Sequence, residues 1–203
     1  MTILTVLITL PDAQARPNPK YASVVMDAQT GDILRARNAH KKLHPASLTK
    51  MMTLFLTFEA LESGRLHKYK YISISPHAAG QPPSKLPLNV GDRITVRDAI
   101  YSLITKSANN VAAALAEEIG GTEWQFAQMM TARARSLGMK NTVFRNASGL
   151  YHRNQISTAY DMALLSRALM QYFPQYYTLF STTQWRYNNK TYPNHNRLLG
   201  KYE

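Results

Sequence analysis

The stretch His44-Pro45-Ala46-Ser47-Leu48-Thr49-Lys50 runs directly into the apolar segment 51–61 (MMTLFLTFEAL), and together they decide the fold. The apolar segment is hydrophobic on nearly every side of a helix, which predicts a helix at the centre of the core. Pro45 suits the entry to such a helix, where its missing N–H costs nothing. We therefore expect a helix that begins around Ser47 and forms the centre of the domain.

Ser47 and Lys50 are three residues apart, so both side chains fall on one face of the expected helix. A buried lysine can lose its proton and activate a neighbouring hydroxyl as a nucleophile. The Ser47 N–H, in the first turn, can also stabilise an oxyanion formed on that residue. The structural alternative makes Ser47 a helix N-cap and Lys50 a solvated first-turn residue. The apolar helix beside Lys50 favours the catalytic interpretation.

Ser107 and Asn109 fall in a predicted break between two helices, from which both side chains can project into a shared cleft. Ser107 could pass a proton between Lys50 and a leaving amine, and Asn109 could hold a substrate amide. The structural alternative is a helix cap, because Ser and Asn are both good N-cap residues. In the presence of Ser47 and Lys50 we favour a catalytic site.

The remaining pattern predicts strands, then a group of helices, then further strands. This order indicates an α+β fold with the helices as a separate lobe. Thr122 with Gln125 forms a capping-box pattern, and Thr158 with Asp161 starts another helix. The expected strands are 21–27 and 33–37, joined as a hairpin, then 71–75, 93–96 and a return to strand from 181; the expected helices are 97–105, 111–119, 122–137 and 158–173.

The composition is that of an ordinary globular protein, with 45% hydrophobic residues in 203 and a net charge of +12. Such a charge favours anionic partners, but the basic residues are scattered, which argues against nucleic-acid binding. There is no cysteine, so disulfides and thiol chemistry are excluded. His40 and His44 have helical spacing, but Pro45 follows and no acidic residue lies between them, so we expect neither a metal site nor a cofactor.

The N-terminus resembles a secretory signal. An apolar run from Ile3 to Leu10 is followed by Ala13-Gln14-Ala15, a small-residue cleavage pattern. The run is too short to span a membrane, so we expect no membrane span. We expect a signal peptide at residues 1–15, a linker at 16–20 and export from the cytoplasm; the alternative is that the run is a buried strand.

Several stretches resemble the serine D-alanyl-D-alanine carboxypeptidases, which are low-molecular-mass penicillin-binding proteins of the penicillin-recognising serine peptidase group. The matching stretches occur in the family's order over about residues 21–203. They are 21–31 (YASVVMDAQTG), 44–50 (HPASLTK), 106–117 (KSANNVAAALAE), 146–150 (NASGL) and 194–200 (NHNRLLG).

This resemblance implies a β-lactamase/D,D-peptidase-like α+β fold, with an antiparallel sheet and a helical lobe. It implies Ser47 as nucleophile, Lys50 as its base, and Ser107 and Asn109 as the second motif. The implied reaction removes the terminal D-alanine from peptidoglycan stem peptides through an acyl-enzyme, without metal or cofactor. β-Lactams would acylate the same serine, and the enzyme would act in the periplasm or otherwise outside the cytoplasmic membrane.

One departure from the family pattern is the absence of a Lys-Thr-Gly triplet, which in the family follows the segment matching 194–200. We expect residues 21–203 to be the N-terminal part of a catalytic domain, with the C-terminal sheet strands missing. Loss of one oxyanion donor lowers a rate by roughly two to three orders of magnitude, so weak activity is expected. One alternative is a non-catalytic binder of cell-wall peptide or β-lactam. Another is a class A β-lactamase, which the absence of an E-x-x-L-N stretch disfavours.

Overall fold

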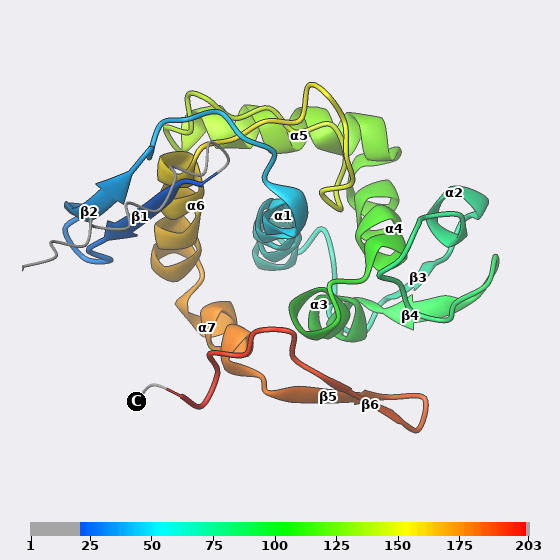
Figure 1. Cartoon of the computed structure of the whole chain (residues 1–203). Coiled ribbons are helices and arrows are strands. Elements are labelled where there is room, and N and C mark those ends of the chain that lie inside the picture. Colours follow the sequence, from blue (N-terminus) through cyan, green and yellow to red (C-terminus); the bar gives the residue numbers. More distant parts are fainter. Residues whose placement is uncertain (1–20, 202–203) are drawn as a thin grey trace, which may run out of the picture.

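The computed structural model describes residues 21–201. The expected signal peptide at residues 1–15 and linker at 16–20 lie outside the described residues. Figure 1 shows the longer helices gathered around α1, with three pairs of strands at the periphery. The elements in chain order are β1 (Ser23–Met26), β2 (Ile33–Arg37), the 3-10 helix η1 (Ala46–Thr49), α1 (Lys50–Glu62), β3 (Tyr71–Ser73), α2 (Pro76–Ala79), β4 (Arg93–Thr95), α3 (Val96–Thr105), α4 (Asn109–Gly120), α5 (Glu123–Ser136), α6 (Ala159–Tyr172), α7 (Pro174–Tyr177), the 3-10 helix η2 (Thr178–Ser181), β5 (Gln184–Tyr187) and β6 (Lys190–Pro193).

Helix α1 is the centre of the core, as the sequence predicts. It contacts α3, α4, α5 and α6, which surround it in Figure 1. Every side chain from Met52 to Phe58 is buried. The two threonines in this stretch satisfy their hydroxyls on backbone carbonyls: Thr57 donates to Thr53 and Thr53 donates to Ala147. The burial of α1 on all sides fixes the position of the Ser47 turn at its N-terminal end.

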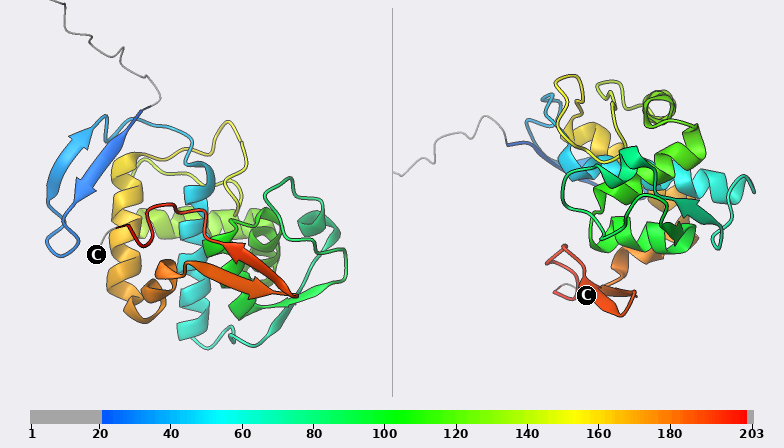
Figure 2. Two further views of the ribbon diagram at one scale, coloured as in Figure 1. Left: turned by 60° about the horizontal axis from the view of Figure 1, so that its bottom comes forward. Right: turned by 90° about the vertical axis from the view of Figure 1, so that its right-hand side faces the viewer.

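The strands confirm the α+β class, but those within residues 21–201 form three separate two-stranded antiparallel sheets: β1–β2, β3–β4 and β5–β6. The β5–β6 turn places Asn188 and Asn189 at positive φ, 46° and 60°, the backbone that a tight hairpin favours. Both views in Figure 2 show the β5–β6 pair on the outside of the helices. Short turns join β1 to β2 and β5 to β6, whereas β3 and β4 are separated by residues 74–92, which include α2. Because each strand pairs only with the next strand along the chain, the strands do not form the one antiparallel sheet that was expected.

The helix starts largely follow the predicted caps. The Thr122 hydroxyl accepts a hydrogen bond from the Gln125 N–H, and Thr158 accepts one from Asp161 N–H. The Asp161 carboxylate, however, accepts hydrogen bonds from the Thr142 hydroxyl and the Asn141 N–H, so it anchors the 139–142 turn. The predicted helix 111–119 begins two residues earlier, at the start of α4.

Two short α-helices, α2 and α7, were not predicted. Both begin at a proline, which is compatible with the first turn of a helix. Helix α7 lies against the end of the core, where Phe173 packs on Phe55 and Tyr176 stacks on Phe58, with ring centroids 4.9 and 4.7 Å apart. Proline in these segments therefore starts a turn of helix rather than marking only a loop.

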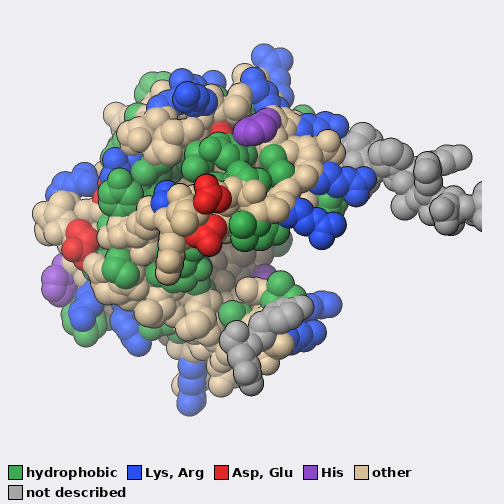
Figure 3. All heavy atoms as spheres, turned by 90° about the vertical axis from the view of Figure 1, so that its left-hand side faces the viewer, with side chains coloured by type: hydrophobic (Ala, Val, Ile, Leu, Met, Phe, Trp, Pro, Cys, Tyr) green, Lys and Arg blue, Asp and Glu red, His purple; other side chains and the backbone are tan. Residues whose placement is uncertain are grey.

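The basic side chains are spread over the surface. On the face shown in Figure 3, Lys and Arg side chains lie around the outline and do not merge into one patch. No helix within residues 21–201 is long and apolar enough to cross a membrane. No group of three or more His, Asp or Glu side chains in the same residues is arranged to hold a metal ion.

Candidate active site

Ser47 lies in η1, the single 3-10 turn that leads into α1. Pro45 precedes this turn, and Ala46 takes a left-handed backbone with φ of 47°. The Ser47 side chain is exposed, and its hydroxyl makes no hydrogen bond to another described residue. Neither η1 nor α1 has a side-chain cap hydrogen bond, so Ser47 is not the N-cap of the structural alternative. The hydroxyl is therefore accessible at the entrance to the core helix.

Lys50 is buried beneath this turn, with only 3% of its surface exposed. Its ammonium donates to the Asn109 side-chain oxygen at 2.7 Å and to the Ser148 carbonyl at 2.6 Å. Both acceptors are neutral. Burial lowers the pKa of the Lys50 ammonium from 10.5 to about 8, because the charged form loses solvation. A lysine with this pKa is partly neutral near physiological pH and can accept a proton, as a general base must.

Ser107 lies in the predicted break between α3 and α4, and Asn109 is the first residue of α4. Ser107 has φ of 57° and is half-buried, and its hydroxyl makes no hydrogen bond to a described residue. The N-cap of α4 is Ala108, without a side-chain cap bond, so neither Ser107 nor Asn109 caps the helix. The turn instead leaves both side chains available for other contacts.

Asn109 uses both ends of its amide within the protein. Its oxygen accepts from Lys50, and its NH2 group donates to the Pro82 carbonyl at 3.0 Å. Its backbone N–H donates to the Ser84 carbonyl at 2.7 Å. The side chain expected to hold a substrate amide is thus engaged in orienting Lys50. A side-chain hydrogen bond joins Lys50 to Asn109, whereas within residues 21–201 the hydroxyls of Ser47 and Ser107 make none to either of them. The Lys50 backbone N–H donates to the Ser47 carbonyl.

The segment Asn146–Leu150 belongs to the site, although its residues were not among those assigned a role from the sequence. Ser148 provides the second acceptor for Lys50, and the Ala147 carbonyl accepts from Thr53 at 2.7 Å. Gly149, at φ of 88°, lies directly against the Ala46 carbonyl. In the sequence, only the glycine of the stretch 146–150 could have indicated a close backbone contact. The carbonyls could not be predicted, because any residue type can supply a backbone carbonyl.

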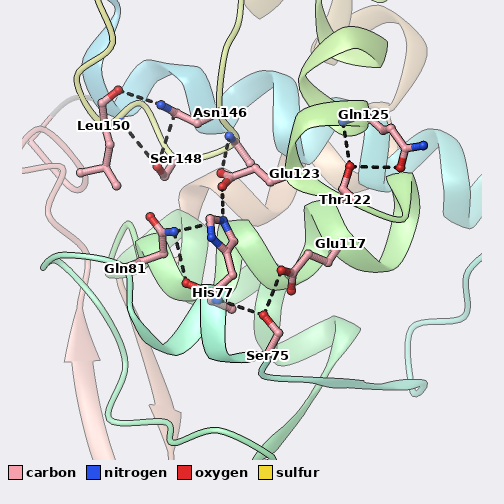
Figure 4. A network of polar contacts seen from close by, with 12 residues as sticks. Ser75, His77, Gln81, Glu117, Thr122, Glu123, Gln125, Asn146, Ser148 and Leu150 are labelled. Carbon is pink, nitrogen blue, oxygen red and sulfur yellow. Dashed lines mark hydrogen bonds and ion pairs between the residues drawn. The ribbon is translucent and has the colours of Figure 1, made fainter.

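This segment is held in place by its own Asn146 side chain and by Glu123 of α5, which His77 of α2 contacts in turn (Figure 4). The Asn146 side chain accepts from Gly149 N–H and donates to the Leu150 carbonyl, both at 2.8 Å. The Glu123 carboxylate accepts from Ala147 N–H at 2.9 Å, and its other oxygen lies 2.6 Å from His77 Nε2. The carbonyl that binds Lys50 is therefore part of a braced loop.

A family model described as D-alanyl-D-alanine carboxypeptidase matches residues 13–203. The chain is 39% identical over 182 residues to the D-alanyl-D-alanine carboxypeptidase DacD of Escherichia coli, which is 87% of this chain and 47% of that protein. It is 36% identical over 151 residues to DacF, a D-alanyl-D-alanine carboxypeptidase of Bacillus subtilis, covering 74% of this chain and 39% of that protein. The chain thus spans about half the length of the curated relatives it matches.

Solved structures of penicillin-binding proteins share the fold of this chain. Penicillin-binding protein 6B from Escherichia coli superposes with a TM-score of 0.83 at 35% identity, over 95% of this chain and 63% of that one. Penicillin-binding protein 5 from Haemophilus influenzae superposes with a TM-score of 0.85 at 34% identity, over 92% of this chain and 56% of that one. The fold expected from the resemblance is therefore confirmed. The chain belongs to the D-alanyl-D-alanine carboxypeptidase family.

Proposed function

We propose that the protein is a serine-type D-Ala-D-Ala carboxypeptidase that acts on peptidoglycan stem peptides through an acyl-enzyme on Ser47. The observation that carries this proposal is the state of Lys50, which is buried, held by two neutral oxygens and lowered in pKa to about 8. An ordinary surface lysine near neutral pH is almost fully protonated and cannot serve as a base. Lys50 lies one turn from an exposed serine hydroxyl that makes no hydrogen bond to a described residue.

In the proposed reaction, neutral Lys50 takes the Ser47 hydroxyl proton as the Ser47 oxygen attacks the carbonyl carbon between the two D-alanines. The Ser47 N–H stabilises the oxyanion of the tetrahedral intermediate. The C–N bond then breaks, and Ser107 relays the proton from Lys50 to the leaving amine of the terminal D-alanine. Water hydrolyses the resulting ester and restores the Ser47 hydroxyl. Asn109 keeps Lys50 oriented throughout.

β-Lactams are the proposed covalent inhibitors, because their strained amide can acylate the same hydroxyl. Penicillin-Binding Protein D2 from Listeria monocytogenes, which matches this chain at 29% identity, has been solved in ampicillin-bound and cefotaxime-bound forms. The signal-like N-terminus supports action outside the cytoplasmic membrane, where peptidoglycan peptides are found. We propose no metal, cofactor or nucleic-acid partner.

The function is tested by measuring D-alanine released from a peptide ending in D-Ala-D-Ala, with Ser47→Ala as the control. We expect release by the native chain and none by the variant. Binding of the peptide without release, by a chain shown to be folded, would instead support the alternative of a non-catalytic binder. Equal release by both chains would exclude Ser47 as the nucleophile.

A further inference from the structure

A cavity of about 510 Å3 lies beside the Ser107 turn, and none of its lining residues has been given a catalytic role. Its lining includes the cationic or titratable side chains Lys85, Lys106, Lys190 and His195 and contains no Asp or Glu. We call this cavity the basic pocket. Its walls come from the segment 85–87, the residue before Ser107, and the β6 strand with the residues that follow it.

The positive charges of the basic pocket are not neutralised within the described residues. The ion pairs among residues 21–201 involve other side chains. The Lys85 ammonium donates to the neutral Ala79 carbonyl, and that of Lys190 lies 5.5 Å from the centre of the Tyr192 ring. Lys106 makes no side-chain interaction with a described residue. The pocket therefore presents an uncompensated cationic surface.

The floor of the basic pocket is apolar. Leu86 is fully buried and Tyr192 nearly so. A low-dielectric wall strengthens the interaction between the lysines and an anion, compared with the same charges on an open surface. A cavity with an apolar floor and several converging polar groups has the usual form of a ligand site.

The basic pocket is fixed relative to the candidate active site. The Ser84 hydroxyl donates to the Lys106 carbonyl at 3.0 Å, and the Ser84 carbonyl accepts from the Asn109 N–H. On the other wall, the His195 N–H donates to the Thr105 carbonyl at 3.1 Å. A peptide bound at Ser47 and passing Ser107 would thus meet the basic pocket at a constant position.

We propose that the basic pocket binds a side-chain carboxylate of an acidic peptide substrate, at a residue away from the bond that Ser47 attacks. This rests on the proposed function, because that function supplies a peptide at the neighbouring site. The carboxylate bound here is distinct from the terminal carboxylate of the substrate. The pocket would accordingly favour peptides that carry acidic residues upstream of the two D-alanines.

The probe is a pair of peptides ending in D-Ala-D-Ala, one with two upstream glutamates and one with glutamines in their place. Binding is measured by calorimetry with Ser47→Ala chains, so that no peptide is consumed. We expect the Ser47→Ala chain to bind the glutamate peptide about fivefold more tightly, the size of a modest charge interaction. Adding Lys85→Gln with Lys190→Gln should remove this preference.

The matched control adds Lys42→Gln with Lys140→Gln, two exposed lysines outside the pocket, and should keep the preference. Equal affinities for the two peptides, no measurable binding, or the same loss in the control would overturn the proposal. A separate measurement, penicillin labelling, shows whether the proposed function itself fails. With Ser47 intact, penicillin should label the Lys85→Gln/Lys190→Gln chain at the native rate, and absence of label on the native chain would count against the function alone.

Discussion

Gly149 packs against Ala46, the residue before Ser47, so closely that a Cβ on Gly149 would lie 1.9 Å from the Ala46 carbonyl oxygen. Gly149 also has φ of 88°, which a residue with a side chain rarely adopts. We predict that Gly149→Ala destabilises the protein by about 2–4 kcal/mol through strain and overlap. Because the Ser47 turn must move, penicillin acylation should slow as well. Urea unfolding and the acylation rate measure the two effects.

Gly91 provides the control for this substitution, because it has the same φ of 88° and nothing within 4 Å of its Cβ position. Gly91→Ala should lower the free energy of unfolding by about 1–2 kcal/mol, the cost of placing a residue with a side chain in the left-handed backbone conformation. It should leave acylation unchanged. Equal losses of stability and activity in the two variants would show that the contact with Ala46 is unimportant.

The lowered pKa of Lys50 predicts how acylation depends on pH. Well below pH 8 only a small fraction of Lys50 is neutral and able to act as a base, and this fraction grows about tenfold per pH unit, so the acylation rate should rise with it. Above pH 8 it should level off, because the neutral form predominates. The measurement is the penicillin acylation rate between pH 6 and 9.5. A flat profile, or one that still rises steeply near pH 10, would contradict the role of Lys50.

Asn109→Asp should move this profile to higher pH. A carboxylate 2.7 Å from the ammonium would stabilise the protonated form and raise the pKa of Lys50, by about 1–2 units. The acylation rate at pH 7 should fall, and part of it should return at pH 9.5. Asn189→Asp adds the same charge in the β5–β6 turn and should leave the midpoint unchanged. A shift of equal size in both variants would point to net charge rather than the contact.

Glu123→Gln should weaken the bracing of the Lys50-binding loop. The substitution removes the negative charge of the carboxylate that accepts a hydrogen bond from the Ala147 N–H and contacts His77. Only 11% of the Glu123 side chain is exposed. We expect a loss of about 1.5–3 kcal/mol in the free energy of unfolding. Glu118→Gln breaks the more exposed pair with Lys70 and should cost less than about 1 kcal/mol. The reverse order in urea unfolding would contradict this interpretation of the loop.

The sequence predicted the parts of the site that depend on local spacing. The apolar run after Lys50 predicted a fully buried helix, and burial of the lysine at its entrance follows from that position. The helix break around Ser107 was also predicted from local pattern. These features arise within a few residues, so their physical cause is visible in a short stretch.

The contacts that hold Lys50 were not predictable in the same way. The Ser148 carbonyl comes from 98 residues further along the chain, and a backbone acceptor can be supplied by any residue type. Asn109 was predicted as a site residue, but its use as an acceptor for Lys50 depends on how α1 and α4 pack. Similarly, the basic pocket is assembled from segments about 20 and 80 residues apart, whose charges appear scattered in the sequence.

The most direct test of the catalytic assignment is the intact mass of the protein after incubation with labelled penicillin at pH 8, followed by peptide mapping. We predict one covalent adduct on the native chain, located on Ser47, and no adduct on Ser47→Ala. Lys50→Met should remain folded and react far more slowly. A folded native chain without an adduct, or an adduct that persists in Ser47→Ala, would contradict the assignment of Ser47 as a nucleophile activated by Lys50.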